Sequence, residues 1–316
     1  MTVPIAATPA RTVLLIAHTG RSEAVEVATA VCKRLRGSGI TVRLLADEAD
    51  DLCIDGAEVT KSDVDAARGC EIALVIGGDG TILRAAALTR AAGTPLLGVN
   101  LGHVGFLAEA EEDDLDSTVD AVIAADYAVE ERMTVDVVVS IDGIVSSHGW
   151  ALNEATIEKA ARQRLLEVIV EIDDRPLSRW GCDGIVIATP TGSTAYAFSA
   201  GGPVVWPEVE ALLMVPISAH ALFARPMVAS PASTLAVEVS STSDSGGVLW
   251  CDGRRTVELP PGSRVEVRRG ARPVRLARLQ QAPFTDRLVA KFELPVDGWR
   301  GGAARRRHDQ RRSRDA

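Results

Sequence analysis

A single carboxylate stands among three glycines between two apolar runs, and this arrangement suits phosphate chemistry. Residues 72–76 are aliphatic, residues 77–81 read Gly-Gly-Asp-Gly-Thr, and residues 82–87 favour a helix. Glycines let the backbone adopt conformations closed to other residues, so that its N–H groups can converge on an anion at the helix start. The pattern predicts a buried strand, a phosphate-binding turn and a helix.

The acidic residue of this turn, Asp79, needs a task, because a bound phosphate repels a carboxylate. Two tasks fit: Asp79 holds Mg²⁺ against the phosphates, or it accepts a proton from a hydroxyl that attacks the terminal phosphorus. A purely structural alternative is that Asp79 caps the helix. The doubled glycine before it and Thr81 after it favour the chemical tasks.

A second polar stretch follows another expected strand. Asp183 precedes the apolar residues 184–188, and residues 189–196 read Thr-Pro-Thr-Gly-Ser-Thr-Ala-Tyr. Four hydroxyl side chains supply donors for a polar ligand, and Tyr196 suits stacking on a base or a hydrogen bond to a ribose. The structural alternative is a capped helix start. The pair Asn153-Glu154, taken alone, reads as a turn at a strand end.

Strands and helices alternate through the first 126 residues. We expect strands over 12–18, 40–46, 72–76 and 95–99, helices over 21–36 and 82–92, and one short helix within 47–69. This order predicts a Rossmann-like parallel sheet covered on both faces. Ligands bind beyond the carboxyl ends of such strands, so Asp79 and the turn over 100–105 are expected to lie together.

The second half of the chain has a different residue pattern. Short apolar runs are punctuated by Gly, Pro, Ser and Asp and predict an all-β domain, with a hairpin at Asp142-Gly143. The expected strands are 135–141, 165–172, 184–188, 235–239, 248–251, 264–268 and 274–279. Residues 284–292 are expected to form a final helix. The predicted units are an α/β phosphate-binding domain (1–126), a β-rich domain (127–283), a C-terminal helix that returns to the first domain (284–300) and a disordered basic tail (301–316).

Composition indicates a soluble cytoplasmic protein. The 316 residues are 47% hydrophobic and 24% charged, and no apolar run approaches the roughly 20 residues that cross a bilayer. Residues 1–10 contain two prolines and lack a basic start, which argues against a secretory signal. The five cysteines form no C-x-x-C pair, so reduced thiols are expected, and the five histidines lack the spacing of zinc ligands.

Charge argues against nucleic acid and membranes as partners. The formal net charge is −9, and the last 16 residues carry six Arg against two Asp, which leaves −13 for the remainder. An acidic body is unsuited to a phosphate backbone.

Motifs of other nucleotide enzymes are missing: there is no G-x-x-x-x-G-K-[ST], and Leu83 stands where G-x-G-x-x-G needs its third glycine.

The order and spacing of the four motifs closely resemble the NAD kinase family over about residues 12–299. Phosphofructokinases and lipid kinases carry similar Gly-Gly-Asp-Gly turns, but the run over 189–196 makes the resemblance specific. It implies transfer of the γ-phosphoryl of ATP, or of inorganic polyphosphate, to the 2′-hydroxyl of the adenosine ribose of NAD, giving NADP. It also implies Mg²⁺ or a similar divalent ion and a homodimer or homotetramer.

The resemblance carries roles over to individual positions. Asp79 matches the proton acceptor, and Asn153 and Glu154 match residues that hold the adenosine half. Asp183 matches a residue that reaches nicotinamide or ribose across a subunit contact. Gly77, Gly78, Gly80 and Thr81 match the phosphate-binding turn of the family. The family positions that contact the dinucleotide are matched by Gly80, Arg84, Phe106, Arg164, Thr194, Ala195, Tyr196, Ala197, Phe198 and Ser199. Arg254 departs from the pattern, because many members have Gln there.

Two other functions are compatible with parts of the pattern. A lipid or sugar kinase uses the same glycine turn, although a pocket rich in Thr and Ser suits a polar acceptor better than a lipid. A non-catalytic dinucleotide sensor would bind NAD without turnover, and Asp79 argues against it. The residues leave open whether ATP or polyphosphate is the donor, whether NADH is accepted, and how NADP(H) regulates the protein.

Overall fold

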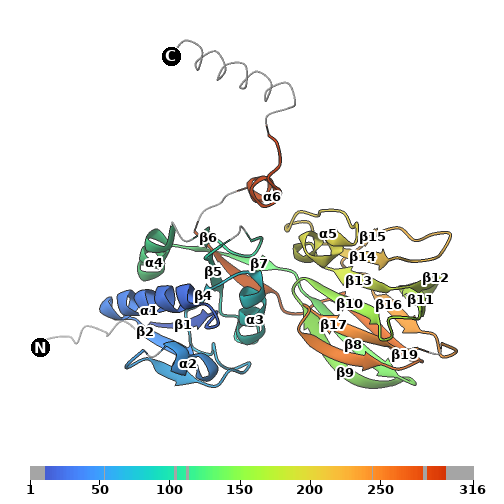
Figure 1. Ribbon diagram of the computed structural model, residues 1–316, viewed down its shortest axis with the longest axis horizontal. Coiled ribbons are helices and arrows are strands. Elements are labelled where there is room, and N and C mark those ends of the chain that lie inside the picture. The colour runs from blue at the N-terminus through green and yellow to red at the C-terminus, as the bar shows by residue number, and fades with distance from the viewer. Residues whose placement is uncertain are drawn as a thin grey trace, which may run out of the picture.

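The computed structural model describes residues 11–52, 54–102, 105–111, 114–243, 245–279 and 283–296. Figure 1 shows two bodies side by side, an α/β domain that carries the N-terminus and a domain made almost entirely of strands. This is the predicted pair of fold classes. The predicted tail over 301–316 and the end of the predicted C-terminal segment, 297–300, lie outside the described residues.

An eight-stranded sheet forms the centre of the first domain. Its strands are β1 (Thr12–Ala17), β2 (Thr41–Leu45), β3 (Glu58–Thr60), β4 (Ile72–Ile76), β5 (Leu96–Asn100), β6 (Ala110–Glu111), β7 (Ala128–Arg132) and β20 (Val274–Arg278). The order is β3-β2-β1-β4-β5-β20-β7, and β6 pairs with β5. Every residue of β4 and β5 is buried, as continuous aliphatic runs at the centre of a parallel sheet should be.

Helices cover both faces of this sheet. They are α1 (Ser22–Gly37), α2 (Ala46–Leu52), α3 (Asp79–Thr89) and α4 (Leu115–Ala124). Successive side chains of β1 point to opposite faces: Val13 and Leu15 pack with α1 and α4, whereas Leu14 and Ile16 pack with α3. Helix α3 starts at Asp79, three residues earlier than predicted, so the carboxylate belongs to the first helical turn.

Two six-stranded antiparallel sheets form the second domain. Their orders are β15-β14-β13-β10-β17-β18 and β12-β11-β16-β19-β8-β9. The strands are β8 (Val135–Ile141), β9 (Ile144–Ala151), β10 (Glu154–Lys159), β11 (Leu166–Ile172), β12 (Arg175–Cys182), β13 (Gly184–Ala188), β14 (Leu212–Ile217), β15 (Met227–Ala229), β16 (Leu235–Val239), β17 (Gly247–Cys251), β18 (Arg255–Leu259) and β19 (Ser263–Arg269). Residues of both sheets share one apolar core around the fully buried Trp180, so the domain is a sandwich.

The hairpin predicted at Asp142-Gly143 joins β8 to β9. Both turn residues have positive φ, 51° for Asp142 and 77° for Gly143, which is the geometry of a two-residue turn that matches strand twist. Between β13 and β14 the chain forms the 3₁₀ helix η2 (Thr191–Thr194) and the short helix α5 (Tyr196–Ser199).

The boundary between the domains differs from the predicted residues 126/127 and 283/284. Strand β7 and strand β20 both belong to the first sheet, where they pair antiparallel and make the sheet mixed instead of parallel. The chain therefore crosses between domains near Thr134 and Gly270, and the Gly270 N–H donates to the Thr134 carbonyl at 2.7 Å. A short strand pattern indicates a strand but not the sheet that it joins, because pairing depends on distant residues.

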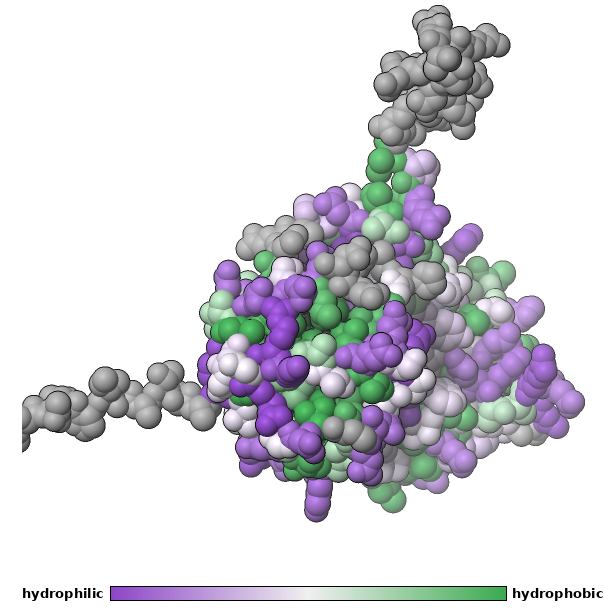
Figure 2. Space-filling model, turned by 60° about the vertical axis from the view of Figure 1, so that its left-hand side comes forward, coloured by the Kyte–Doolittle hydropathy of each residue, from purple (hydrophilic) through white to green (hydrophobic). Residues whose placement is uncertain are grey.

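Helix α6 (Phe284–Phe292) has the predicted bounds and bridges both domains. Its Phe284 and Phe292 rings lie 5.9 and 5.8 Å from the Phe106 ring of the first domain. The same two rings lie 5.4 Å from Trp206 and 4.7 Å from Phe198 of the second domain. Beyond α6 the last described residues, 293–296, are exposed and include the hydrophobic Leu294 and Val296; in Figure 2 the chain leads away from the body there.

Candidate active site

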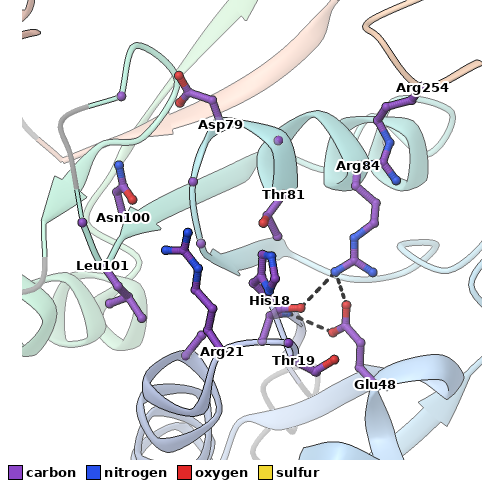
Figure 3. A pocket seen from close by; sticks show the side chains of 18 of the residues that line it. His18, Thr19, Arg21, Glu48, Asp79, Thr81, Arg84, Asn100, Leu101 and Arg254 are labelled. Atoms are coloured by element: carbon purple, nitrogen blue, oxygen red, sulfur yellow. Dashed lines mark hydrogen bonds and ion pairs between the residues drawn. The ribbon is translucent and has the colours of Figure 1, made fainter.

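The loops that follow β1, β4 and β5 surround a cavity of about 830 Å³ (Figure 3). These are the carboxyl ends of three neighbouring parallel strands, where ligands of such sheets bind. Asp79, Asn100, Gly102 and Gly105 all line the cavity. The prediction that Asp79 and the turn over 100–105 lie together is confirmed for the described residues of that turn.

The glycine turn is closely packed against its own helix. Gly77 has a φ of 147°, and a Cβ there would lie 2.6 Å from Thr81 Oγ1, so glycine is required on both counts. Gly77, Gly78, Gly80 and Thr81 all line the cavity. Gly78 precedes the first turn of α3, so the unpaired N–H groups and the positive dipole end of the helix face the cavity.

Asp79 is held by the backbone of the neighbouring loop. The Phe106 N–H donates to its Oδ2 and the Leu107 N–H to its Oδ1, both at 3.3 Å. Gly105 lies so close that a Cβ there would clash with Oδ1. These contacts fix the carboxylate within the phosphate-binding cavity, where it can meet either a metal ion or the proton of an acceptor hydroxyl.

Arg84 enters the same cavity from α3 but is already engaged. Its guanidinium pairs with Glu48 and donates to the Ala17 carbonyl at 3.0 Å, and Asp47 lies 3.9 Å away (Figure 3). Glu48 is buried, and burial raises its pKa although the pair with Arg84 opposes this. Arg84 therefore anchors α2 to α3 at the cavity floor, and its predicted contact with the dinucleotide stays a prediction.

A second cluster lies in the β domain, where Asn153 and Glu154 are both buried. Asn153 Oδ1 and Glu154 Oε2 have no hydrogen-bond partner among the described residues. Buried polar atoms are nearly always hydrogen-bonded, so these two atoms are suited to bond polar groups of a ligand. Burial first, and the Asp252 charge second, raise the pKa of Glu154 to about 8, while the Tyr196 N–H lowers it.

The hydroxyl-rich run packs directly onto this cluster. Thr189 Oγ1 donates to the Leu152 carbonyl at 2.6 Å, and the Thr189 N–H donates to the Asn153 carbonyl at 2.9 Å. The same Thr189 Oγ1 accepts the Gly192 N–H at 3.1 Å, which closes the turn into η2. The predicted nucleotide residues Thr194, Ala195, Tyr196, Ala197, Phe198 and Ser199 follow in η2, α5 and the residue between them. The structure thus brings Asn153-Glu154 and this run together.

Three further predicted residues do not line the cavity. Phe106 is buried against α6 and does not line the cavity; its backbone, not its ring, meets Asp79. Asp183 pairs with Lys159, which holds the pKa of Asp183 below its usual range. Arg164 is exposed in the loop between β10 and β11. The roles of all three stay predictions.

Sequence reasoning missed several residues that position the site. Asp252 is buried and accepts the N–H groups of Leu152 and Asn153 at 3.0 and 2.7 Å, and it pairs with Arg255. The Arg255 guanidinium lies 4.3 Å from the centre of the Trp150 ring, and the guanidinium of Arg90 of the first domain lies 4.4 Å from it. No local pattern signals the contacts between the segments around Trp150, Asp252 and Arg90, because they join residues 60 to about 100 positions apart.

The loop after β1 was missed as well, although a signal for it existed. His18, Thr19, Gly20 and Arg21 line the cavity beside the glycine turn. They follow the first expected strand of a parallel sheet, and the rule that places Asp79 at a carboxyl end places this loop there too. Among the described residues no group of three or more His, Cys, Asp or Glu side chains is arranged to hold a metal ion.

Replacing Glu154 with Gln is expected to stabilise the protein at high pH. The pKa of Glu154 is about 8 in the folded state against 4.5 when unperturbed, so the folded state binds more protons between these values. Stability is therefore lost as pH rises from about 4.5 to 8. Gln carries no charge and avoids this loss, which is about 5 kcal/mol at pH 9 for a pKa difference of about 3.5.

Melting temperatures of both proteins at pH 5 and pH 9 measure this effect. The gain of Glu154→Gln over the unaltered chain is expected to be small at pH 5 and large at pH 9. Glu258→Gln, at an exposed position of β18, serves as the control and should show no such change. Equal gains at both pH values would contradict the raised pKa.

Comparisons with known proteins match both halves of the chain to one family. The family models described as ATP-NAD kinase N-terminal domain and ATP-NAD kinase C-terminal domain match residues 13–127 and 152–279. NAD kinase 2 of Streptomyces coelicolor is 66% identical over 296 residues, covering 92% of this chain and 97% of that protein. The NAD kinase of Thermobifida fusca is 63% identical over 306 residues, covering 94% and 93%.

Solved structures share the fold. Yeast NADH kinase complexed with NADH superposes with a TM-score of 0.83 at 21% identity, over 92% of this chain and 89% of that chain. An NAD kinase from Archaeoglobus fulgidus in complex with ATP gives 0.66 at 24% identity, over 90% and 98%. Since both family models match in order and relatives more than half identical cover nearly the whole chain, the chain belongs to the NAD kinase family.

Proposed function

We propose that this chain transfers the γ-phosphoryl of ATP to the 2′-hydroxyl of the adenosine ribose of NAD and so produces NADP. The observation that carries the proposal is the placement of Asp79 in a cavity formed by a glycine turn and a helix start. Family membership supports the choice of substrates, because the relatives over 60% identical are named NAD kinases. Among the described residues, the buried side-chain oxygens Asn153 Oδ1 and Glu154 Oε2 have no hydrogen-bond partner and suit polar groups of the adenosine half.

Different groups of the site act on the transferred phosphate and on the acceptor hydroxyl. The backbone N–H groups of Gly78, Asp79 and Gly80, at the start of α3, bind the phosphate that is transferred and stabilise its charge, whereas the Gly77 and Thr81 N–H groups donate to the Val99 and Gly78 carbonyls. Asp79 orients the 2′-hydroxyl of the ribose. It accepts the proton of this hydroxyl as the bond from the ribose oxygen to the γ-phosphorus forms and the bond from that phosphorus to ADP breaks. The N–H groups of Phe106 and Leu107 keep its carboxylate in place during this step.

A divalent ion such as Mg²⁺ is part of the proposal. Mg²⁺ is commonly held by one or two carboxylates together with substrate phosphates and waters, and it neutralises charge on the donor. Asp47 and Asp79 both line the cavity, and either carboxylate would hold such an ion together with the donor phosphates. Inorganic polyphosphate offers the same phosphate chemistry as ATP and is an alternative donor.

Product analysis tests the proposed function. The purified chain is incubated with NAD and Mg²⁺ plus either ATP or inorganic polyphosphate, and NADP is measured by a dehydrogenase that accepts NADP alone. We expect NADP with at least one donor and none when EDTA removes the metal. Absence of NADP with either donor, together with phosphorylation of diacylglycerol or a sugar by ATP, would replace this function with the lipid or sugar kinase.

We also propose a cytoplasmic location and a homodimer or homotetramer. The structure has no helix, among the residues it describes, with the length and apolar character to span a membrane. Cys32, Cys70, Cys182 and Cys251 form no disulfides, as expected of thiols in a reducing compartment. Light scattering on the purified protein measures its mass and therefore the number of subunits.

Mixed oligomers test whether Asp183 serves a neighbouring subunit. Asp183 does not line the cavity that holds Asp79, so both residues can act on one dinucleotide if two chains share a site. Asp79→Asn and Asp183→Asn chains are expected to be nearly inactive alone and to regain about a quarter of the sites when coexpressed at random. Tagged mixed oligomers with no activity above the two variants would show that Asp183 is not shared.

A further inference from the structure

The α/β domain by itself gives its phosphate cavity an unfavourable charge. Among the described residues of this domain, the cavity is lined by two cations, Arg21 and Arg84, and by three carboxylates, Asp47, Glu48 and Asp79. With His18 taken as neutral, the formal charge of this lining is −1. Glycine-turn amides and a helix dipole favour an anion, but a chain of phosphates also needs positive side chains to offset these carboxylates.

Arg84 contributes little to that task, because it is committed to the cavity floor. Its guanidinium pairs with Glu48 and lies 3.9 Å from Asp47. Arg21 has no ion-pair partner among the residues that the structure describes, so it is the one cation that the α/β domain itself offers to a ligand here. Arg21 and the divalent ion proposed above together offset only part of the negative charge of a triphosphate, and Asp79 opposes them.

Two further cations reach the cavity from outside the α/β domain. Arg254 extends from the turn between β17 and β18 of the sandwich toward the side of the cavity where Arg84 lies (Figure 3). Lys291 extends from α6. Neither has an ion-pair partner within the described part of the chain, and together they change the formal charge of the lining from −1 to +1.

The position of Lys291 is set by the packing of α6. Phe292, the next residue, contacts Phe106 and Phe198, and Phe284 contacts Phe106 and Trp206. Arg287 of the same helix donates to Glu109 at 2.8 Å. These contacts hold α6 across both domains, so Lys291 is presented to the cavity by a docked element and not by a loose terminus.

We propose that Arg254 and Lys291 bind the phosphate chain of the phosphoryl donor, so that the donor site is completed by the β domain and by α6. The inference rests on the proposed function for the identity of the donor, but the charge argument applies to any linear polyphosphate. Arg254 supplies a planar fork of donors for two phosphate oxygens, and Lys291 supplies a compact charge. Both are binding residues for the donor and leave the acceptor cluster at Asn153 and Glu154 untouched.

Calorimetric titration with inorganic tripolyphosphate tests this assignment directly. Arg254→Ala and Lys291→Ala are each expected to weaken its binding about tenfold, which corresponds to about 1.4 kcal/mol. Lys291→Arg keeps the charge and should bind within about threefold of the unaltered chain. Arg268→Ala, at an exposed position of β19 that does not line the cavity, is the matched control and should have no effect.

Steady-state kinetics separate donor from acceptor. Both alanine variants should raise the KM for ATP about tenfold and change the KM for NAD by less than about twofold. Tripolyphosphate affinities within about twofold of the unaltered chain for both variants, or no binding to the unaltered chain, would overturn the inference. If tripolyphosphate binds with the expected pattern while no NADP forms, the proposed function fails and the assignment of the two cations stands.

Discussion

Replacing Asp79 with Asn is expected to lower kcat by about 10²- to 10⁴-fold while NAD binding stays within about tenfold. Asn keeps the size and shape of Asp but cannot accept the proton of the ribose hydroxyl. It also has one acceptor oxygen instead of two, so one of the N–H groups of Phe106 and Leu107 loses its partner. The effect should fall on turnover, because the residues that hold the dinucleotide are unchanged.

NADP formation under saturating NAD and ATP measures kcat, and calorimetry with NAD alone measures binding. Asp65→Asn is the control, because Asp65 lies on the surface and pairs with the exposed Arg68. A melting temperature within a few degrees of the unaltered chain would show that the loss is chemical. An Asp79→Asn enzyme with nearly full activity would contradict the assignment of Asp79 as the proton acceptor.

Replacing Gly192 with Ala is expected to cost about 3 kcal/mol or more in the free energy of unfolding and to weaken NAD binding more than tenfold. A Cβ at Gly192 would lie 2.8 Å from Asn153 Cα and would overlap the Asn153 carbonyl. These are backbone atoms and cannot move aside as a side chain does. The turn into η2 would have to separate from Asn153-Glu154, which would disrupt the acceptor cluster.

Chemical denaturation measures the loss of stability, and calorimetry with NAD measures the loss of binding. Gly37→Ala is the matched control, since a Cβ there meets no atom within 4 Å and its φ is not positive. If Gly192→Ala and Gly37→Ala behaved alike, the close approach of the two segments would not matter to the site.

The aliphatic runs and the glycine turn were sufficient to predict the α/β domain. Strands β1, β4 and β5 and helices α1 and α6 lie within one or two residues of their predicted ranges, because each carries a local pattern of burial. Strand β7 was not predicted, since Ala128–Arg132 alternates weakly and is mostly charged. Strand β20 was predicted but given to the wrong domain, because its partners β5 and β7 lie more than 140 residues earlier.

The residues of the site likewise divide into those that a local sequence pattern predicts and those that only distant contacts place. The sequence by itself determined the phosphate turn, Asp79 and the hydroxyl-rich run, because glycine spacing and residue type specify a local backbone shape and a chemistry. Only the tertiary structure decided that Asp252 holds the backbone of Asn153, that Glu154 is buried enough for its pKa to rise to about 8, and that Arg254 and Lys291 enter the cavity. Burial and charge depend on which distant segments pack together, and packing is a property of the folded chain as a whole.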